Sequence, residues 1–238
     1  MSDSELRFSN KAGEEYDLFS HVLPHQMEMQ RKCAGILKNH FSSSVKNIAV
    51  LEIGFGTGLT SHEILSVDDR VHLVAIDSEP KMLVKTEKKL ESFASSRFEL
   101  FTSEAFEYLK SLTDESFDAV ITVWVLHNLQ NDFRQKVLKE IYRVLKKGGV
   151  FINGDKIAVT NAKEHKDHLD WQLAHFDTFV KMGRPELKKE WTDHYMEDED
   201  PDRILFEESY TADLKALNFK KVEITGRHFL DAISVAVK

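Results

Sequence analysis

The fold is decided by the stretch Ile48-Ala49-Val50-Leu51-Glu52-Ile53-Gly54-Phe55-Gly56-Thr57-Gly58. Its first half is a short, almost continuous apolar run, which is typical of a strand buried on both faces. The glycines that follow suit a tight turn into a helix and let a ligand approach the main chain closely. Because the first N–H groups of a helix carry partial positive charge, this turn favours an anionic ligand group.

The same alternation of apolar runs and helix-period segments continues along the chain. Strands are expected at 71–77, 98–102, 117–125 and 150–155, and helices between them at 80–90 and 131–145. Strands that alternate with helices indicate an α/β fold, with a mostly parallel sheet and helices on both faces.

The last third of the chain departs from this alternation. Residues 161–196 are polar-rich and predict an inserted helical segment, and 207–217 predict a last helix. Two β-rich runs, 221–225 and 231–237, are joined by a few residues, as in a hairpin. We therefore expect the final strand to be antiparallel.

Composition narrows the class of protein. The chain has 238 residues, with 32 Lys+Arg against 40 Asp+Glu and a net charge of −8, which argues against broad nucleic-acid binding. Cys33 is the only cysteine and has no intramolecular disulfide partner. The acidic N-terminus predicts no cleaved signal peptide, and no apolar window approaches the ~20 residues of a membrane span. We expect a soluble cytoplasmic protein without a membrane partner, and a homodimer is compatible with the sequence.

The glycine stretch differs from two other nucleotide-binding loops. Leu59 stands where a dinucleotide fingerprint has a third Gly or Ala, which disfavours NAD or FAD. A P-loop is excluded because no Gly-Lys-Ser/Thr follows. A mononucleoside with a carboxylate tail needs less room at the helix start than a pyrophosphate does.

Two carboxylates accompany the turn. Asp77 ends the second strand, 19 positions after Gly58, where it can accept from both hydroxyls of a ribose. Alternatively Asp77 caps the helix that begins at Pro80, although Ser78 could serve as that cap. Glu52 ends an apolar strand, and we expect it to face a cleft and a donor-rich group, because a buried carboxylate needs a partner. The alternative is a solvent-facing carboxylate at the strand end.

Taken together, these motifs resemble the class I S-adenosylmethionine-dependent methyltransferases. The matching motifs are Glu52-x-Gly54-x-Gly56-x-Gly58, Asp77 with Ser78-Glu79-Pro80-Lys81-Met82-Leu83, Ser116-Phe117-Asp118, Val125-Leu126-His127-Asn128-Leu129 and Leu145-Lys146-Lys147-Gly148-Gly149-Val150-Phe151. They cover roughly residues 45–157, and their order and spacing are more specific than any one of them. The resemblance implies a Rossmann-like sheet of seven strands with the last one antiparallel, in agreement with the hairpin.

The resemblance also implies a cofactor site for S-adenosyl-L-methionine. The methionine portion would lie against Gly54, Phe55, Gly56 and Gly58, with Glu52 near its amino group. Asp77 would hold the ribose, with Ser78 beside the adenine. The adenine amino group would meet Ser103, Glu104 and Ala105, unless Glu104 instead caps the helix that follows. Val123 and Trp124 would line the side of the methyl donor.

The N-terminal segment looks like the lid helices of a subgroup of small, mostly bacterial members. The matching residues are Tyr16-Asp17-Leu18-Phe19 and Leu23-Pro24-His25-Gln26-Met27, and the likeness adds Tyr16 to the cofactor-binding residues. The subgroup includes carboxy-S-adenosylmethionine synthases, in which an arginine of the last helix clasps the extra carboxylate. Here Asp213 stands at that place, which favours plain methyl transfer.

The resemblance divides the chain into four parts. They are an N-terminal helical lid (1–45), a cofactor-binding core (46–157), a helical insertion that caps the acceptor (158–210), and a C-terminal helix and hairpin that complete the sheet (211–238).

Histidines supply the candidate bases. His127 follows the fourth strand, whose carboxyl end should face the ligand crevice, so it is the predicted catalytic residue, with a purely structural role as the alternative. His21 and His25 in the lid are weaker candidates. His165, His168 and His175 share one helix face, but without a cysteine among them we expect the polar border of an apolar stripe and no metal site.

The predicted function is methyl transfer from S-adenosylmethionine to a small-molecule acceptor. Three alternatives remain: different chemistry with the same cofactor, such as carboxy-S-adenosylmethionine synthesis; a non-catalytic binding protein on this fold; and a nucleic-acid-modifying enzyme, which the net charge of −8 disfavours.

Overall fold

Seven strands form one sheet at the centre of the computed structural model, which describes residues 18–23, 25–43 and 45–238. The strands are β1 (Ile48–Ile53), β2 (Val71–Asp77), β3 (Phe98–Thr102), β4 (Phe117–Val123), β5 (Leu145–Lys156), β6 (Lys220–His228) and β7 (Asp231–Val237). Their order is β3-β2-β1-β4-β5-β7-β6, and β7 runs antiparallel to both of its neighbours. The predicted α/β fold and antiparallel last strand are confirmed.

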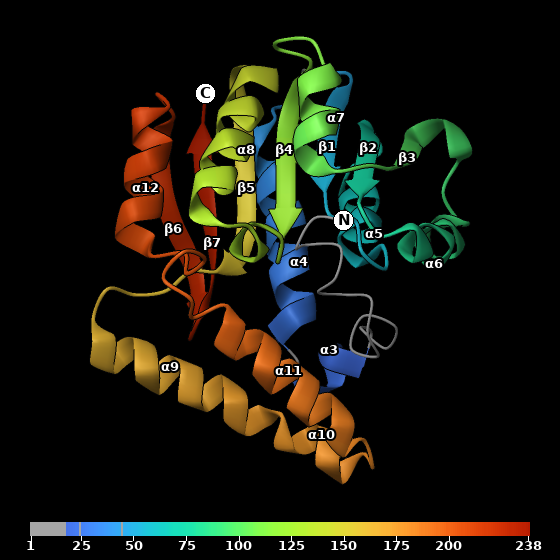
Figure 1. Cartoon of the computed structure of the whole chain (residues 1–238). Helices are drawn as coiled ribbons and strands as arrows, with labels where there is room; N and C mark the ends of the chain where they lie inside the picture. The colour runs from blue at the N-terminus through green and yellow to red at the C-terminus, as the bar shows by residue number, and fades with distance from the viewer. Residues whose placement is uncertain (1–17, 24, 44) are drawn as a thin grey trace.

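Helices cover both faces of the sheet (Figure 1). One face packs on α4 (His25–His40), α5 (Leu59–Val67) and α6 (Pro80–Leu90), and the other on α7 (Ala105–Ser111), α8 (Asn131–Val144) and α12 (Glu207–Ala216). On α8 the buried residues Val137, Leu138, Ile141 and Val144 recur at helical spacing, so the helix has one apolar side. The sheet therefore lies between two apolar cores.

The strand order places a crevice beside β1. The chain runs from β1 outward to β2 and β3, then crosses back to pair β4 with the other side of β1. Ile53, the last residue of β1, pairs with Ile76 of β2 and with Thr122 of β4, so the carboxyl ends of these strands are level. Ligands of open α/β sheets bind at such a switch point, outside the carboxyl ends.

A layer of helices lies below the carboxyl end of β4 (Figure 1). It contains α3 (Phe19–Val22), α9 (Ala162–His175), α10 (Asp177–Lys181) and α11 (Pro185–Glu197). These helices have a buried core of their own, in which Phe19 stacks on Trp191 with ring centres 4.1 Å apart. The segment before β1 and the insertion after β5 thus fold onto each other.

Several predicted boundaries differ from the structure, three of them with a clear physical reason. β5 begins at Leu145 and not at Val150, because Leu145 pairs with Phe117 across a bulge. β4 ends at Val123, and Trp124 after it has a φ of 53°, which lies outside the extended region of a regular strand. The segment predicted as helical at 161–196 is broken into three helices, with Gly183 at a φ of 76° in the second break.

Within the part of the chain that the structure describes, no helix combines the length and the apolar character needed to cross a bilayer.

Candidate functional site

A cavity of about 160 Å³ opens at the carboxyl ends of β1, β2 and β4. The predicted site residues that line it are Gly54, Phe55, Gly56, Asp77, Ser78, Ser103, Glu104, Ala105 and Val123. Glu52 and Gly58 are not among the lining residues, and Tyr16 lies outside the described residues. The structure therefore brings together residues from four successive strand ends, as the prediction required.

The turn after β1 needs glycine for two separate reasons. Gly54, Gly56 and Gly58 have φ values of 79°, 50° and 81°, which L side chains rarely adopt. A Cβ on Gly54 would lie 2.4 Å from Cγ2 of Val125, and one on Gly58 would lie 2.9 Å from Thr86. A Cβ on Gly56 would meet nothing within 4 Å. The outer glycines thus permit packing, whereas Gly56 leaves bare main chain beside the cavity.

Asp77 joins the turn to the start of α6. Its Oδ2 accepts from the Gly56 N–H at 2.7 Å and its Oδ1 from the Glu79 N–H at 2.8 Å. Burial raises the pKa of Asp77, and these two hydrogen bonds oppose that rise. A carboxylate has about four acceptor positions, so it can still receive ligand hydroxyls. The cap of α6 is Glu79, so the prediction that Ser78 or Asp77 caps this helix is wrong.

Glu52 is buried beneath the turn and does not face solvent, so that alternative is wrong. Its Oε2 accepts from the Ser61 hydroxyl at 2.5 Å, while Oε1 has no hydrogen-bond partner. Burial, which is the larger effect, and the nearby Asp77 charge raise the pKa of Glu52 to about 8. The carboxyl group is therefore mostly protonated at neutral pH.

The far end of the cavity is built around α7. Ser103, Glu104 and Ala105 line it together with Met82 of α6, and the Ser103 N–H donates to the Asp77 carbonyl at 2.9 Å. Glu104 occupies the N-cap position of α7, but its side chain makes no capping hydrogen bond. The prediction that Glu104 serves as a cap is thus wrong, and the carboxylate stands at the cavity wall.

Gln30 of α4 is a lining residue that the sequence did not reveal. It is almost fully buried, and its Oε1 has no hydrogen-bond partner. A buried acceptor without a partner costs about 1–3 kcal/mol, a loss that a donor on a bound ligand would recover. This orphaned oxygen and the bare backbone of Gly56 fit a ligand with N–H or O–H groups. No pattern around Gln30 distinguishes it from other polar residues of a surface helix.

Trp124 forms the cavity wall after β4, held in its left-handed backbone conformation from two sides. Its N–H donates to the Gly154 carbonyl at 2.8 Å, and its indole Nε1 donates to Oδ1 of Asp231 at 3.1 Å. Asp231 is fully buried, and its Oδ2 also binds His25 Nε2 at 2.6 Å and Gln172 Nε2 at 3.2 Å. Asp231 thus connects the wall to α4 and α9. An aspartate at the start of a buried strand was the only sequence signal for it.

His127 lies against a second cavity, of about 20 Å³, which shares no lining residue with the large one. Its Nδ1 is 2.5 Å from Oδ1 of the fully buried Asp155. Burial, more than the neighbouring Lys156 charge, lowers the pKa of His127. The expectation that His127 faces the large cavity is not met, because the chain turns through Leu126–Asn128 and directs the imidazole behind the wall. A catalytic role of His127 stays a prediction.

Three of the other candidate histidines, His25, His165 and His175, have separate partners. His25 is held by Asp231, and His21 is exposed. His165 binds Glu199 at 2.6 Å, and His175 Nδ1 lies 2.8 Å from the Trp171 carbonyl oxygen. His25, His165 and His175 therefore each have their own local partner.

Comparison with known proteins shows what the chain is similar to. Residues 50–149 match the family model of a methyltransferase domain. A carboxy-S-adenosyl-L-methionine synthase from Nautilia profundicola is 25% identical over 172 residues, which cover 72% of this chain and 69% of that protein. A thiol S-methyltransferase from Mus musculus is 30% identical over 112 residues, or 47% and 44% of the two chains.

The whole fold also has a solved counterpart. A crystal structure described as a putative S-adenosyl-L-methionine-dependent methyltransferase from Methanococcus maripaludis covers 100% of this chain and 97% of its own, with a TM-score of 0.65 at 16% identity. Residues 50–149 are therefore similar to a methyltransferase domain, and this match spans less than half of the chain.

Proposed function

We propose that this protein transfers the methyl group of S-adenosylmethionine to a small-molecule acceptor in the large cavity. The observation that carries the proposal is Gly56, whose bare backbone borders the cavity while its N–H is held by Asp77. The backbone of Gly56 gives an amino-acid tail a surface to lie on, and the neighbouring Asp77 carboxylate can accept from ribose hydroxyls. The cofactor, when bound, supplies a methyl group on a positively charged sulfur.

The side chains divide the cavity between the parts of that cofactor. Asp77 would accept from the ribose hydroxyls, and Ser103 to Ala105 would surround the adenine. The amino-acid end would lie against the bare backbone from Gly54 to Gly56, whose N–H groups already donate to the Ile76 carbonyl and to Asp77. Gln30 Oε1 would accept from an N–H or O–H group of the ligand, which supplies the partner that it lacks.

The acceptor would lie against Val123, Trp124 and Leu129, at the side of the cavity toward the helical layer α3 and α9–α11. These walls position the acceptor and exclude water, and such alignment can lower a barrier by up to ~7–11 kcal/mol. A general base is needed only for an acceptor of high pKa. The helical layer is thus the proposed cap over the acceptor.

Carboxylate transfer is the second candidate, because carboxy-S-adenosylmethionine synthases are among the relatives. A cofactor with an extra carboxylate would require a cation beside it. No lysine or arginine lines the large cavity in the described part of the chain, and Asp213 lies on α12 away from it. Methyl transfer is therefore favoured, and mass spectrometry of the ligand retained on purification distinguishes the two.

Replacing Asp77 by alanine tests the cofactor site. Loss of two charge-assisted hydrogen bonds should weaken cofactor affinity by ~2–4 kcal/mol in calorimetric titration. The control is Asp69→Asn, which alters an exposed carboxylate paired with Arg97 and should leave the affinity unchanged. Equal affinities of wild type and Asp77→Ala would refute the ribose assignment.

Turnover separates an enzyme from a binding protein. Incubation of labelled cofactor with a small-molecule extract should give methylated products, whereas transfer RNA or ribosomal RNA should not be labelled. Tight cofactor binding with no turnover on any acceptor would favour the non-catalytic alternative, and labelled RNA would favour nucleic-acid modification. A cytoplasmic location and a homodimer stay predictions.

A further inference from the structure

Three buried side chains meet where the helical layer joins the sheet. His127 comes from the short helix after β4, whereas His194 and Asp198 stand four positions apart at the end of α11. One ligand atom from each lies within 4.8 Å of the others. His127 Nε2 is 3.8 Å from Asp198 Oδ2, and His194 Nε2 is 3.9 Å from the same oxygen.

These separations are close to those of a metal centre. Ligand atoms bound to tetrahedral zinc at 2.0–2.1 Å stand about 3.3 Å apart. Because the three ligand atoms here lie within 4.8 Å of one another, no pair would have to approach by more than about 1.5 Å. Two imidazoles and one carboxylate form a ligand set that divalent transition metals accept readily. The i, i+4 spacing of His194 and Asp198 places both on one face of α11.

A second carboxylate orients the first imidazole. Asp155 Oδ1 lies 2.5 Å from His127 Nδ1, and Asp155 also accepts the backbone N–H groups of Leu126, His127 and Lys156. A proton shared on Nδ1 leaves Nε2 as the lone-pair atom directed at Asp198. Imidazoles that bind metals are held by a carboxylate in this way.

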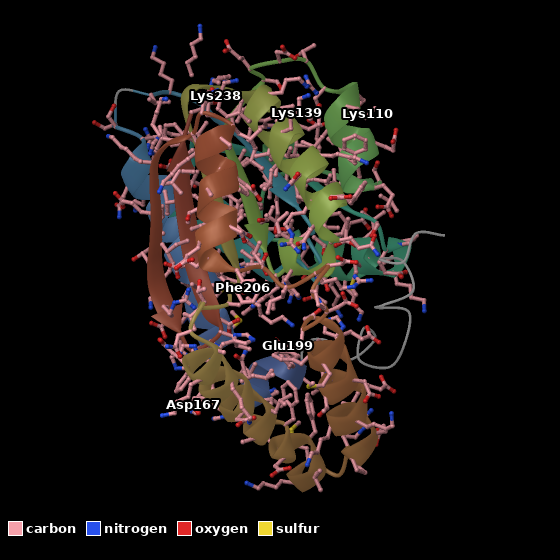
Figure 2. The ribbon with its side chains drawn as sticks, turned by 60° about the vertical axis from the view of Figure 1, so that its left-hand side comes forward. Lys110, Lys139, Asp167, Glu199, Phe206 and Lys238 are labelled. Atoms are coloured by element: carbon pink, nitrogen blue, oxygen red, sulfur yellow. The ribbon has the colours of Figure 1, made fainter. Side chains whose placement is uncertain are left out.

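The adjoining cavity matches the size of the proposed ligand. It measures about 20 Å³, and its lining includes His127, Asp198 and Glu199. A void of that size admits one water molecule and no organic acceptor, since a single water needs roughly 10–15 Å³. Figure 2 shows the region where the helical layer meets the sheet, with Glu199 on the side of α11 and Phe206 on the side of α12.

Lys156 is the competing cation. Its ammonium pairs with Asp198 Oδ2, and Nζ also lies 3.6 Å from the ring centre of Tyr195. Asp198 and Glu199 line the same small cavity as Lys156, and Asp155 accepts the Lys156 backbone N–H. A divalent cation would add the positive charge that this buried group lacks, while Lys156 keeps its contact with the aromatic face.

We propose that His127, His194 and Asp198 bind one zinc ion, with a water in the small cavity as the fourth ligand. The ion joins α11 to the loop after β4, and so fixes the helical layer to the sheet. When the metal binds, the ion pair between Lys156 and Asp198 breaks.

Titration of the chelator-treated full chain with zinc chloride tests the proposal, and cobalt chloride reports the geometry by its visible absorption. Wild type should bind one equivalent of zinc, and cobalt should give the intense bands of a tetrahedral site. His194→Gln and Asp198→Asn should each weaken zinc binding by more than about 100-fold, and Asp155→Asn by about 10–100-fold. Lys156→Met should bind zinc more tightly and gain thermal stability when zinc is added.

Two control variants locate the ion. His165→Gln alters the same cavity, and His228→Gln alters the other close pair of imidazoles, His25 and His228, whose ring centres are 4.2 Å apart. Both should bind zinc like wild type. Failure of wild type to bind zinc, weaker zinc binding by Lys156→Met, or loss of binding in His228→Gln alone would overturn the proposal.

Discussion

Glu52 is the residue whose protonation the fold changes most clearly among the groups around the glycine turn. Its pKa rises from an ordinary value of 4.5 to about 8, chiefly because the carboxyl group is buried. Between these two values the folded chain keeps a proton that the unfolded chain releases. The contribution to stability is therefore full below pH 4.5 and declines as the pH rises toward 8.

Replacing Glu52 by glutamine should remove that dependence, since an amide does not titrate. Urea unfolding at several pH values should show wild type losing on the order of a few kcal/mol relative to Glu52→Gln between pH 5 and 8. Parallel stability curves for the two proteins would show that Glu52 does not titrate in this range.

The residues of the turn that line the cavity were predictable one by one, because each has a local chemical reason. Gly54, Gly56 and Asp77 follow from strand ends and from the spacing between them. Gln30 and Asp231 were not, since their positions depend on how α4 and β7 pack against distant segments. His127 was expected at the large cavity because strand ends indicate an edge of the sheet, but not the direction of a side chain in the loop that follows.

At the scale of elements, Asp231 unites α4, α9 and the loop after β4. A fully buried carboxylate that accepts three side-chain hydrogen bonds has few substitutes. Asparagine has the same shape but replaces one acceptor oxygen by an NH₂ group, which can only donate. That NH₂ group would point at a side chain that itself donates, such as Trp124 or Gln172. The network must then lose at least one bond.

Asp231→Asn should destabilise the chain by about 1–3 kcal/mol and raise hydrogen exchange at α4 and α9. Asp167→Asn is the matched control, because Asp167 is exposed on the same helix α9 (Figure 2). Equal exchange in both variants would show that Asp231 does not hold these helices.

Element boundaries were predictable where a single residue forces them. Pro80 starts α6, and the hairpin of β6 and β7 follows its two β-rich runs. The start of β5 was not, because Leu145 joins the sheet only through pairing with Phe117 across a bulge. Such pairing depends on the neighbouring strand, so the hydrophobic pattern of the residues around Leu145 does not predict it.

At the scale of the whole molecule, the helical layer is a separate apolar unit. Its core is formed by α3, α9, α10 and α11, with Leu230 as the contact from the sheet. The two clusters that hold the sheet contain none of these helices. Unfolding of the layer therefore need not unfold the sheet.

Trp191→Ala should expose this independence. Loss of a buried tryptophan that stacks on Phe19 costs about 3–5 kcal/mol, and the cost falls on the layer alone. Hydrogen exchange should then increase throughout α9–α11 while β1 and β4 stay protected. Equal loss of protection in the sheet would mean that layer and sheet unfold as one.

Because Asp231 binds Trp124 with one oxygen and His25 and Gln172 with the other, the wall of the large cavity and the two helices beside it share one anchor. Any opening wide enough to admit an acceptor, if it displaces α4 or α9, also loosens the indole. The indole at the cavity wall is therefore coupled to the positions of α4 and α9 through one carboxylate.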